Sequence, residues 1–361
     1  MEKIKVGIIG CGGMGNTHAN VISQIDNVEI FAASDLSEEK LARFNEKFKP
    51  AYSFADYRKL IEMSEIDAVL VCLPTYLHKE PVVIAAKNGK HIFCEKPIAL
   101  TLEDADVMIN ECEKNRVVFT IGFVRRFDNE WGKFRDIVIE GKLGRPVVWR
   151  NGIILSAPPA PWYMDKDKGG GPFIDGCVHN YDFARYIFGD LKRVAGMPAK
   201  INKKVTALDT GTFIVEFKSG DQHVVSWSWA LPGKCDSGRR INDAFGPCGI
   251  VNFQESFDKK FLPPDFNSDK EGAFLLDNGN NIQVIRYEKN KMFIEQMVHF
   301  IECVKGNAKP CVTGLDGYEA LKIGLSINKD NILDNTDNQT KEKKKNNIEK
   351  SPQEKKEKVK K

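Results

Sequence analysis

The sequence lacks a long apolar stretch, an export signal and a paired set of cysteines. No run approaches the roughly 18 consecutive apolar residues that a membrane-spanning helix needs. The N-terminal segment MEKIKVGIIG has no basic region followed by a long apolar run and a small-residue cleavage site, as an export signal would. Nine cysteines form an odd set without CxxC spacing, so neither a disulfide framework nor a zinc ribbon is expected. We therefore expect a cytoplasmic protein with reduced thiols and no membrane partner.

A net positive charge is also missing from most of the chain, although the net charge of the whole chain is +3. Residues 328–361 hold eleven lysines against seven acidic residues, which leaves the preceding 327 residues with a net charge of −1. A body without excess positive charge argues against specific nucleic-acid binding. The lysine-rich segment has few apolar residues to bury, so we expect 328–361 to be a disordered tail. It is either simply solvated or in weak electrostatic contact with RNA or an anionic surface.

The six histidines show no spacing typical of metal ligands. Neither HxH nor HxxxH occurs among them, so no metal site is expected.

The first 122 residues alternate short β-rich runs with helical patterns. The runs 6–9 and 69–72 are apolar throughout, as in strands that are covered on both faces. This alternation predicts an α/β fold with a parallel, doubly wound sheet. The expected strands are 5–9, 28–33, 68–72, 91–94 and 117–121, and the expected helices include 17–25, 37–48 and 102–115.

The pattern changes after about residue 145, where strands follow one another without crossover helices. This predicts a C-terminal α+β domain over 123–327 with a large, mainly antiparallel open sheet. The segment 225–229, VSWSW, alternates with period two, so Trp227 and Trp229 should share one face of a half-covered sheet. We expect strands at 147–154, 212–217, 222–229, 249–253 and 282–287, and closing helices at 292–304 and 315–327.

A glycine-rich turn follows the first predicted strand. Gly10-Cys11-Gly12-Gly13-Met14-Gly15 is a GxGxxG pattern between a buried strand and a helix, and Asp35 lies 20 residues after its last glycine. This context indicates a Rossmann dinucleotide-binding domain over residues 1–122, with the pyrophosphate at the helix N-terminus. A carboxylate at Asp35 would bind the ribose hydroxyls and repel a 2′-phosphate, and no arginine follows it directly. We therefore expect NAD rather than NADP as the cofactor.

Two further motifs supply groups suited to hydride transfer. Glu95-Lys96-Pro97 directly follows the expected strand 91–94. It therefore lies at the carboxyl edge of the sheet, where ligands of such folds bind. Asp175 and His179 are four residues apart before a helical pattern, so they should share one helix face. A neutral imidazole can take the proton of a secondary hydroxyl, and an ammonium can stabilise the developing charge on its oxygen. Taken singly, the lysine could be a solvated turn residue and the Asp/His pair a surface pair or a helix cap.

The combination of motifs resembles the Gfo/Idh/MocA oxidoreductases, in particular inositol 2-dehydrogenases, over roughly residues 3–327. The resemblance rests on VGIIGCGGMG, on EKP and on the Asp175 to His179 pair within GGGPFIDGCVHNYDFARYIFG. It implies that Lys96, Asp175 and His179 form the catalytic set, with His179 as the proton acceptor. The segment GFVRRFD also looks like that of inositol dehydrogenases, which implies that Arg125 lies near cofactor and substrate.

The resemblance also extends the expected cofactor site. Where the family often has T-P-N-x-x-H, this chain has Leu73-Pro74-Thr75-Tyr76-Leu77-His78, so Thr75 replaces an asparagine. The expected cofactor-binding residues are Gly10, Gly12, Gly13, Met14, Gly15, Asp35, Leu73, Pro74, Thr75, His78, Glu95, Lys96 and Arg125. The expected substrate-binding residues are Lys96, Arg125, Trp162, Asp175, His179 and Asn180.

No single residue in the sequence identifies the substrate. Trp162, Tyr163 and Asn180 could line a sugar-sized cleft, although Trp162 and Tyr163 could equally be packing residues of the second domain. We expect a cyclic polyol such as an inositol first, and then a hexose, a sugar acid or a nucleotide sugar. A hydrolase that uses NAD transiently and a non-catalytic NAD-binding regulator are the alternatives of other classes. We also expect a homodimer or homotetramer that pairs through the sheet face carrying Trp227 and Trp229.

Overall fold

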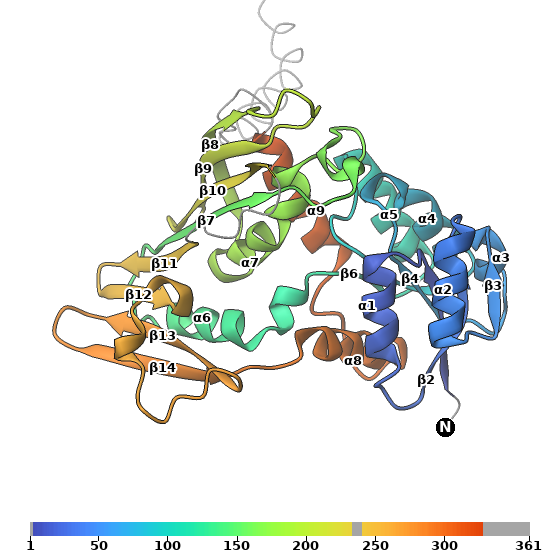
Figure 1. Cartoon of the computed structure of the whole chain (residues 1–361), viewed down its shortest axis with the longest axis horizontal. Helices are drawn as coiled ribbons and strands as arrows, with labels where there is room; N and C mark the ends of the chain where they lie inside the picture. Colours follow the sequence, from blue (N-terminus) through green and yellow to red (C-terminus); the bar gives the residue numbers. More distant parts are fainter. Residues whose placement is uncertain (1–2, 233–239, 328–361) are drawn as a thin grey trace, which may run out of the picture.

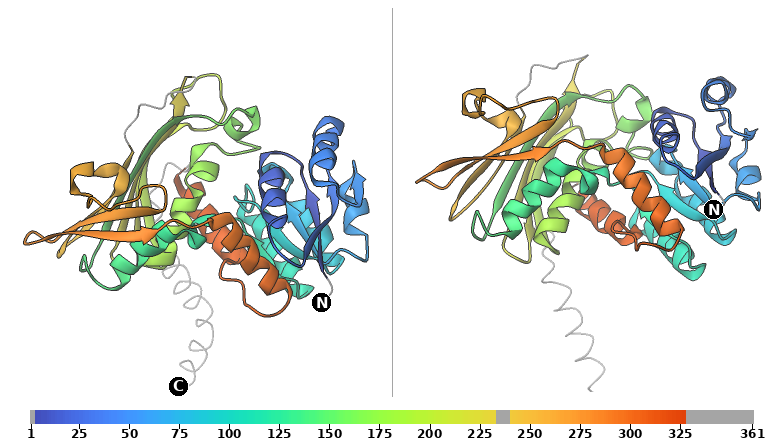
Figure 2. Two further views of the ribbon diagram at one scale, coloured as in Figure 1. Left: turned by 60° about the horizontal axis from the view of Figure 1, so that its bottom comes forward. Right: turned by 90° about the horizontal axis from the view of Figure 1, so that it is seen from below.

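The structure, a computed structural model, describes residues 3–232 and 240–327 and contains two sheets side by side (Figure 1, Figure 2). The predicted lysine-rich tail lies outside the described residues. The first sheet is parallel, with six strands in the order β3-β2-β1-β4-β5-β6. This order confirms the predicted doubly wound Rossmann sheet. Its strands are β1 (Ile4–Ile9), β2 (Val28–Ser34), β3 (Tyr52–Phe54), β4 (Ala68–Val71), β5 (His91–Cys94) and β6 (Phe119–Ile121).

The helices of this half begin where the local sequence favours them. At α2, the Ser37 side chain accepts a hydrogen bond from the Lys40 N–H, and two acidic residues occupy the first turn. The helices are α1 (Gly13–Ile22), α2 (Glu38–Phe48), α3 (Tyr57–Ile61), α4 (Lys79–Lys87) and α5 (Leu102–Lys114), with a 3₁₀ turn η1 (Thr75–Leu77).

The second sheet has eight strands in the order β14-β13-β12-β11-β7-β10-β9-β8. Only the β7/β10 pair is parallel, which confirms the predicted mainly antiparallel sheet. Its strands are β7 (Val148–Ser156), β8 (Leu191–Ala199), β9 (Thr210–Phe217), β10 (Gln222–Leu231), β11 (Ile241–Gly246), β12 (Gly249–Phe253), β13 (Glu271–Asp277) and β14 (Ile282–Glu288).

Among the described residues, the remaining four helices lie on the second sheet or pack against helices of the first half. The helices α6 (Asn129–Ile139) and α7 (Val178–Phe188) lie along one face of the second sheet, as Figure 1 shows. The helix α8 (Met292–Val304) returns to pack on α1, and α9 (Gly314–Ile327) packs on α5 and α7. The division of the chain at residue 122 stays a prediction, with α8 and α9 folded back against the first sheet.

The position of the two sheet tryptophans requires a correction. Trp227 and Trp229 share one face as predicted, but it is the covered face: a Cβ on Gly176 would lie 2.8 Å from Cζ2 of Trp229 and 3.2 Å from Nε1 of Trp227. They are therefore unavailable as an interface between subunits, since the turn before α7 covers them. The opposite face is open and carries Met197 and Ile214, which are 83% and 42% exposed.

Within the two described segments, every helix is too short or too polar to cross a membrane.

Candidate active site

The glycine-rich turn after β1 leaves open space at the N-terminus of α1. Gly10 has a φ of +98°, and a Cβ on Gly15 would lie 1.9 Å from the carbonyl oxygen of Gly10, so side chains are excluded at both positions. By contrast, a Cβ on Gly12 or Gly13 would meet no described atom within 4 Å. The turn is therefore tight where it packs and open where a pyrophosphate would approach the N–H groups of the helix.

Asp35 lies at the end of β2, directly beside this turn. Its Oδ2 accepts a 2.8 Å hydrogen bond from the Cys11 N–H, and its Oδ1 accepts one of 2.8 Å from the Ser37 N–H. Two backbone donors thus fix the carboxylate next to the open cradle, in the place where a ribose would follow the pyrophosphate.

The loop after β4 is tied to the loop after β5 through His78. Its ring is fully buried, with Nε2 2.8 Å from the Leu73 oxygen and Nδ1 3.0 Å from the Pro97 oxygen. His78 thus holds the predicted cofactor loop in place through contacts with backbone oxygens of both loops. In the same loop, the hydroxyl of Thr75 is buried and has no hydrogen-bond partner among the described residues. An orphaned buried hydroxyl at this place fits a bound cofactor, which would supply a partner.

The structure brings Lys96 and Asp175 together across 79 residues of sequence. The Lys96 Nζ lies 3.1 Å from Oδ1 of Asp175 and 3.2 Å from its carbonyl oxygen. Burial alone would lower the pKa of the Lys96 ammonium, but the charges of Asp175 and Glu95 outweigh this effect and raise it. Lys96 is therefore a charged group held at a fixed point in the site.

His179 is the second residue of α7, and its surroundings keep it neutral. Burial is the largest cause of its lowered pKa, and the charges of Lys96 and Arg125 lower it further. Its Nδ1 is buried and pairs with no described residue. Asp175 precedes it in a separate π-helical turn, η4 (Pro172–Gly176), so the two do not lie on one regular helix as expected. A neutral imidazole beside an ammonium can accept a proton from a hydroxyl.

The remaining predicted residues differ in how free their side chains are. Arg125, in the 3₁₀ turn η2 (Val124–Phe127), is held by Asp128 at 2.6 Å, and its charge reaches His179. The Asn180 side chain is buried and donates a 3.0 Å hydrogen bond to Asn151 on β7. It thereby joins α7 to the sheet, and its contact with a substrate stays a prediction.

An aromatic cluster lies beside Asp175, and the sequence placed only two of its four members, Trp162 and Tyr163, in a possible cleft. Trp162 and Tyr163 of the 3₁₀ turn η3 (Pro161–Met164) stack with centroids 3.8 Å apart, and Tyr163 meets Trp229 edge-on at 6.2 Å. Trp229 in turn lies against Gly176, the neighbour of Asp175. We call Trp162, Tyr163, Trp227 and Trp229 the aromatic wall. The alternating pattern in β10 indicated a shared face for its tryptophans, but not that the face adjoins the catalytic candidates.

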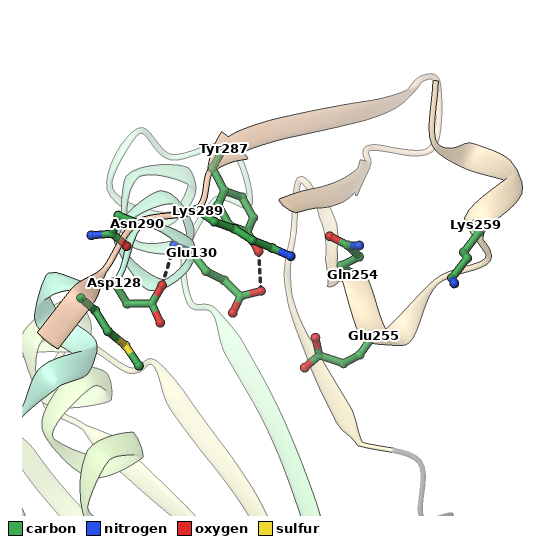
Figure 3. Close-up of a pocket in the computed structure, with 9 residues that line it drawn as sticks. Asp128, Glu130, Gln254, Glu255, Lys259, Tyr287, Lys289 and Asn290 are labelled. Carbon is green, nitrogen blue, oxygen red and sulfur yellow. Dashed lines mark hydrogen bonds between the residues drawn. The ribbon is translucent and has the colours of Figure 1, made fainter. Parts of the chain in front are cut away.

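A separate hollow of about 500 Å³ lies between the start of α6, the end of β14 and the segment after β12 that contains Gln254 and Glu255 (Figure 3). Asp128, which holds Arg125, lines it, and so does Glu130, whose Oε1 accepts a 2.6 Å hydrogen bond from the Tyr287 hydroxyl. Lys96, Asp175 and His179 are not among its lining residues. We therefore do not place the reaction there.

For metals, the described residues contain no group of three or more His, Cys, Asp or Glu side chains placed to bind an ion.

Comparison with known proteins agrees with this geometry. Residues 4–123 match the model of the oxidoreductase family with an NAD-binding Rossmann fold, and residues 131–242 match the GFO/IDH/MocA C-terminal domain. Myo-inositol 2-dehydrogenase of Thermotoga maritima is 34% identical over 332 residues, which cover 90% of this chain and 96% of that protein. The NAD-dependent scyllo-inositol 2-dehydrogenase of Bacillus subtilis is 26% identical over 343 residues, covering 90% and 93%.

A solved structure shows the same architecture along most of the chain. The crystal structure of a probable dehydrogenase from Thermotoga maritima superposes with a TM-score of 0.73 at 31% identity, covering 91% of this chain and 98% of that one. Both halves of the fold, the glycine turn with Asp35 and the matched family models therefore agree: this chain belongs to the Gfo/Idh/MocA family of NAD-dependent oxidoreductases.

Proposed function

We propose that this protein is an NAD-dependent dehydrogenase that oxidises a secondary hydroxyl of a cyclic polyol, with an inositol as the first candidate. The observation that carries the proposal is the pairing of a charged Lys96, held by Asp175, with a neutral His179 beside it. Two inositol dehydrogenases among the relatives support this choice of substrate class.

The proposed roles follow from the charge states in the site. Lys96 donates a hydrogen bond to the substrate oxygen and stabilises the negative charge that develops there. His179 accepts the hydroxyl proton. Its lowered pKa keeps the imidazole neutral before the reaction, so a ring nitrogen is free to take the proton. Asp175 holds the ammonium in place. When bound, NAD accepts the hydride.

The cofactor would be held by the open cradle at Gly12 and Gly13, by Asp35 and by the loop that contains Thr75. Asp35 favours NAD because its carboxylate would repel a 2′-phosphate.

The aromatic wall supports a ring-shaped substrate. A cyclic polyol presents C–H groups on its faces and hydroxyls around its rim, so an indole face and nearby charged groups suit it. Trp162 and Tyr163 are the partly buried members of the wall, and of these two we assign the contact to the indole of Trp162.

A substrate panel tests the proposal directly. The absorbance of NADH is followed while inositols, hexoses, pentoses, uronates and nucleotide sugars are offered with NAD or NADP. We expect the highest kcat/KM with an inositol and NAD. A uronate or nucleotide sugar as the best substrate would replace the polyol. Glycoside cleavage without net NADH would indicate the hydrolase alternative, and NAD binding without any turnover would indicate a regulator.

We also propose that the protein is a cytoplasmic homodimer or homotetramer that pairs through the open face of the second sheet. Exposed apolar side chains on this face, Met197, Ile214, Ile154 and Ile241, support the proposal. Light scattering would contradict it by finding a monomer.

A further inference from the structure

A buried polar contact joins the helix of the glycine turn to the strand that leads into Lys96. His18 lies on α1, three residues after Gly15, and its side chain is fully buried. Its ring meets Phe93 and Phe293 edge-on, with centroids 4.9 and 6.0 Å apart. Its Nε2 is 2.6 Å from Oε1 of Glu95. A polar pair enclosed by aromatic rings is tolerated only because the two groups bind each other.

The same carboxylate also binds the backbone of Lys96. Its Oε2 accepts a 3.2 Å hydrogen bond from the Lys96 N–H. Burial alone would raise the pKa of Glu95, but the hydrogen bond and charge of His18 and the charge of Lys96 outweigh it and lower the pKa. A Cβ on Gly122 would lie 3.1 Å from three atoms of the carboxyl group, so glycine there lets the carboxylate fit closely.

The imidazole of His18 has one available partner. Its Nδ1 is buried and makes no hydrogen bond with any residue in 3–232 or 240–327. The proton on Nε2 is therefore the one that the contact uses, and it is donated to the ionised Glu95.

We propose that His18 is a positioning residue, which acts through Glu95 to hold the backbone of Lys96 and thus its ammonium at the reaction centre. The contacts run without a gap from α1, which carries the cofactor cradle, through His18, Glu95 and Lys96 to Asp175. This inference rests on the proposed function, since it assigns Lys96 to the substrate oxygen. It adds a residue that none of the motifs contains.

Three variants separate positioning from packing. His18→Leu keeps an apolar volume but removes the donor, and His18→Gln keeps an N–H donor at the same distance along the side chain. His91→Gln is the matched control, because His91 lies at the other end of β5, where its ring accepts a hydrogen bond from the Val118 N–H. With myo-inositol and NAD as the probes, we expect His18→Leu to lower kcat by about 10- to 100-fold, the usual cost of a misplaced catalytic group. The KM for NAD should stay near that of the parent, His18→Gln should recover part of the loss, and His91→Gln should retain the parental kcat.

The pH profile gives a readout that packing alone would not move. Without His18, the pKa of Glu95 loses the largest effects that lower it and rises, although the charge of Lys96 still lowers it, so the acid limb of kcat/KM should shift to higher pH in His18→Leu. The shift should be absent in the double variant His18→Leu/Glu95→Gln, whose amide does not titrate. An unchanged kcat and pH profile in His18→Leu would overturn the proposal.

A measurement without substrate distinguishes failure of this proposal from failure of the proposed function. In ¹⁵N-histidine-labelled protein, the Nε2 proton of His18 should give a low-field resonance that disappears in His18→Gln and moves upfield in Glu95→Gln. If myo-inositol is not oxidised but this pattern is seen, the proposed substrate is wrong and the His18–Glu95 contact stands. A His18 resonance that Glu95→Gln leaves unmoved would overturn the contact itself.

Discussion

Replacing His223 with phenylalanine tests how a buried histidine makes the stability of the second sheet depend on pH. His223 lies on β10, is fully buried and stacks on Trp149 with centroids 4.2 Å apart and planes 16° apart. Neither ring nitrogen has a hydrogen-bond partner in the described part of the chain. Burial therefore lowers the pKa of His223 from 6.5 to about 3.

The magnitude follows from the two protonation states. In the unfolded chain, His223 is protonated below about pH 6.5, whereas in the folded protein it is protonated only below about pH 3. Stability is therefore lost as the pH falls through this window. Each pH unit well inside the window is worth about 1.4 kcal/mol, which makes the loss between pH 7 and pH 5 about 2 kcal/mol.

The assay is urea unfolding of the parent and of His223→Phe at pH 7 and at pH 5, followed by tryptophan fluorescence. Phenylalanine keeps a flat ring against Trp149 and does not titrate. We expect the variant to lose about 2 kcal/mol less than the parent between the two pH values. Equal losses in the two proteins would refute the reasoning, because His223 would then bind its proton equally in the folded and unfolded states.

Three further predictions concern the cofactor, the substrate and assembly. The double variant Asp35→Asn/Leu36→Arg should lower the preference for NAD over NADP by about 10- to 100-fold, since a charged hydrogen bond is worth about 1.5–3 kcal/mol. Steady-state kinetics with both cofactors measures the ratio of the two kcat/KM values, and an unchanged ratio counts against the role of Asp35. Trp162→Ala should raise the KM for a cyclic polyol by about 2- to 12-fold while the KM for an open-chain polyol stays the same, as expected for loss of about 0.5–1.5 kcal/mol of ring contact. Equal effects on both substrates would indicate that Trp162 is a packing residue. Ile214→Asp should dissociate the oligomer in light scattering, whereas Ile139→Asp, at an isoleucine on α6 that is even more exposed, should not. An intact oligomer in Ile214→Asp would exclude the open face as the interface.

The parallel sheet was predictable because its strands carry strong local signals. The strand β4 is apolar throughout and buried on both faces, and the glycine turn marks the passage from β1 to α1. The strand β3 was not predicted because it has only three residues and lies at the edge of the sheet, with Tyr52 exposed.

Three strands of the second sheet escaped prediction for different physical reasons. The strand β8 contains glycine and proline and is largely exposed, so it has little apolar alternation. The strand β11 has small and polar residues at buried positions. The strand β13 is a short apolar run that cannot be distinguished from a helix segment by its period.

Some residues of the candidate site were likewise predictable from the sequence, and others were not. Lys96, Asp175 and His179 could be found because motifs carry them, although the π-helical turn at Asp175 has no signal in the spacing. Tyr163 was a candidate for the cleft, but its contact with Trp229 was not predicted, and His18 was not found at all. These contacts join segments far apart in the sequence. His18 did leave one local clue: it follows Gly15 by three residues, which places it on the helix face that packs against the sheet.

In the proposed reaction, His179 accepts the proton and Lys96 holds the substrate oxygen. Single-turnover kinetics of NAD reduction by an inositol, in the parent, His179→Ala and Lys96→Ala, tests these two roles most directly. Lys79→Ala is the control, because Lys79 pairs with Asp104 on the surface of α4 and α5. We expect each site variant to lose about 10²-fold or more in rate, as for removal of an acid/base or charge-stabilising group. The affinity of His179→Ala for NAD should stay close to that of the parent, and Lys79→Ala should retain the parental rate. Near-parental turnover in either His179→Ala or Lys96→Ala would contradict the account.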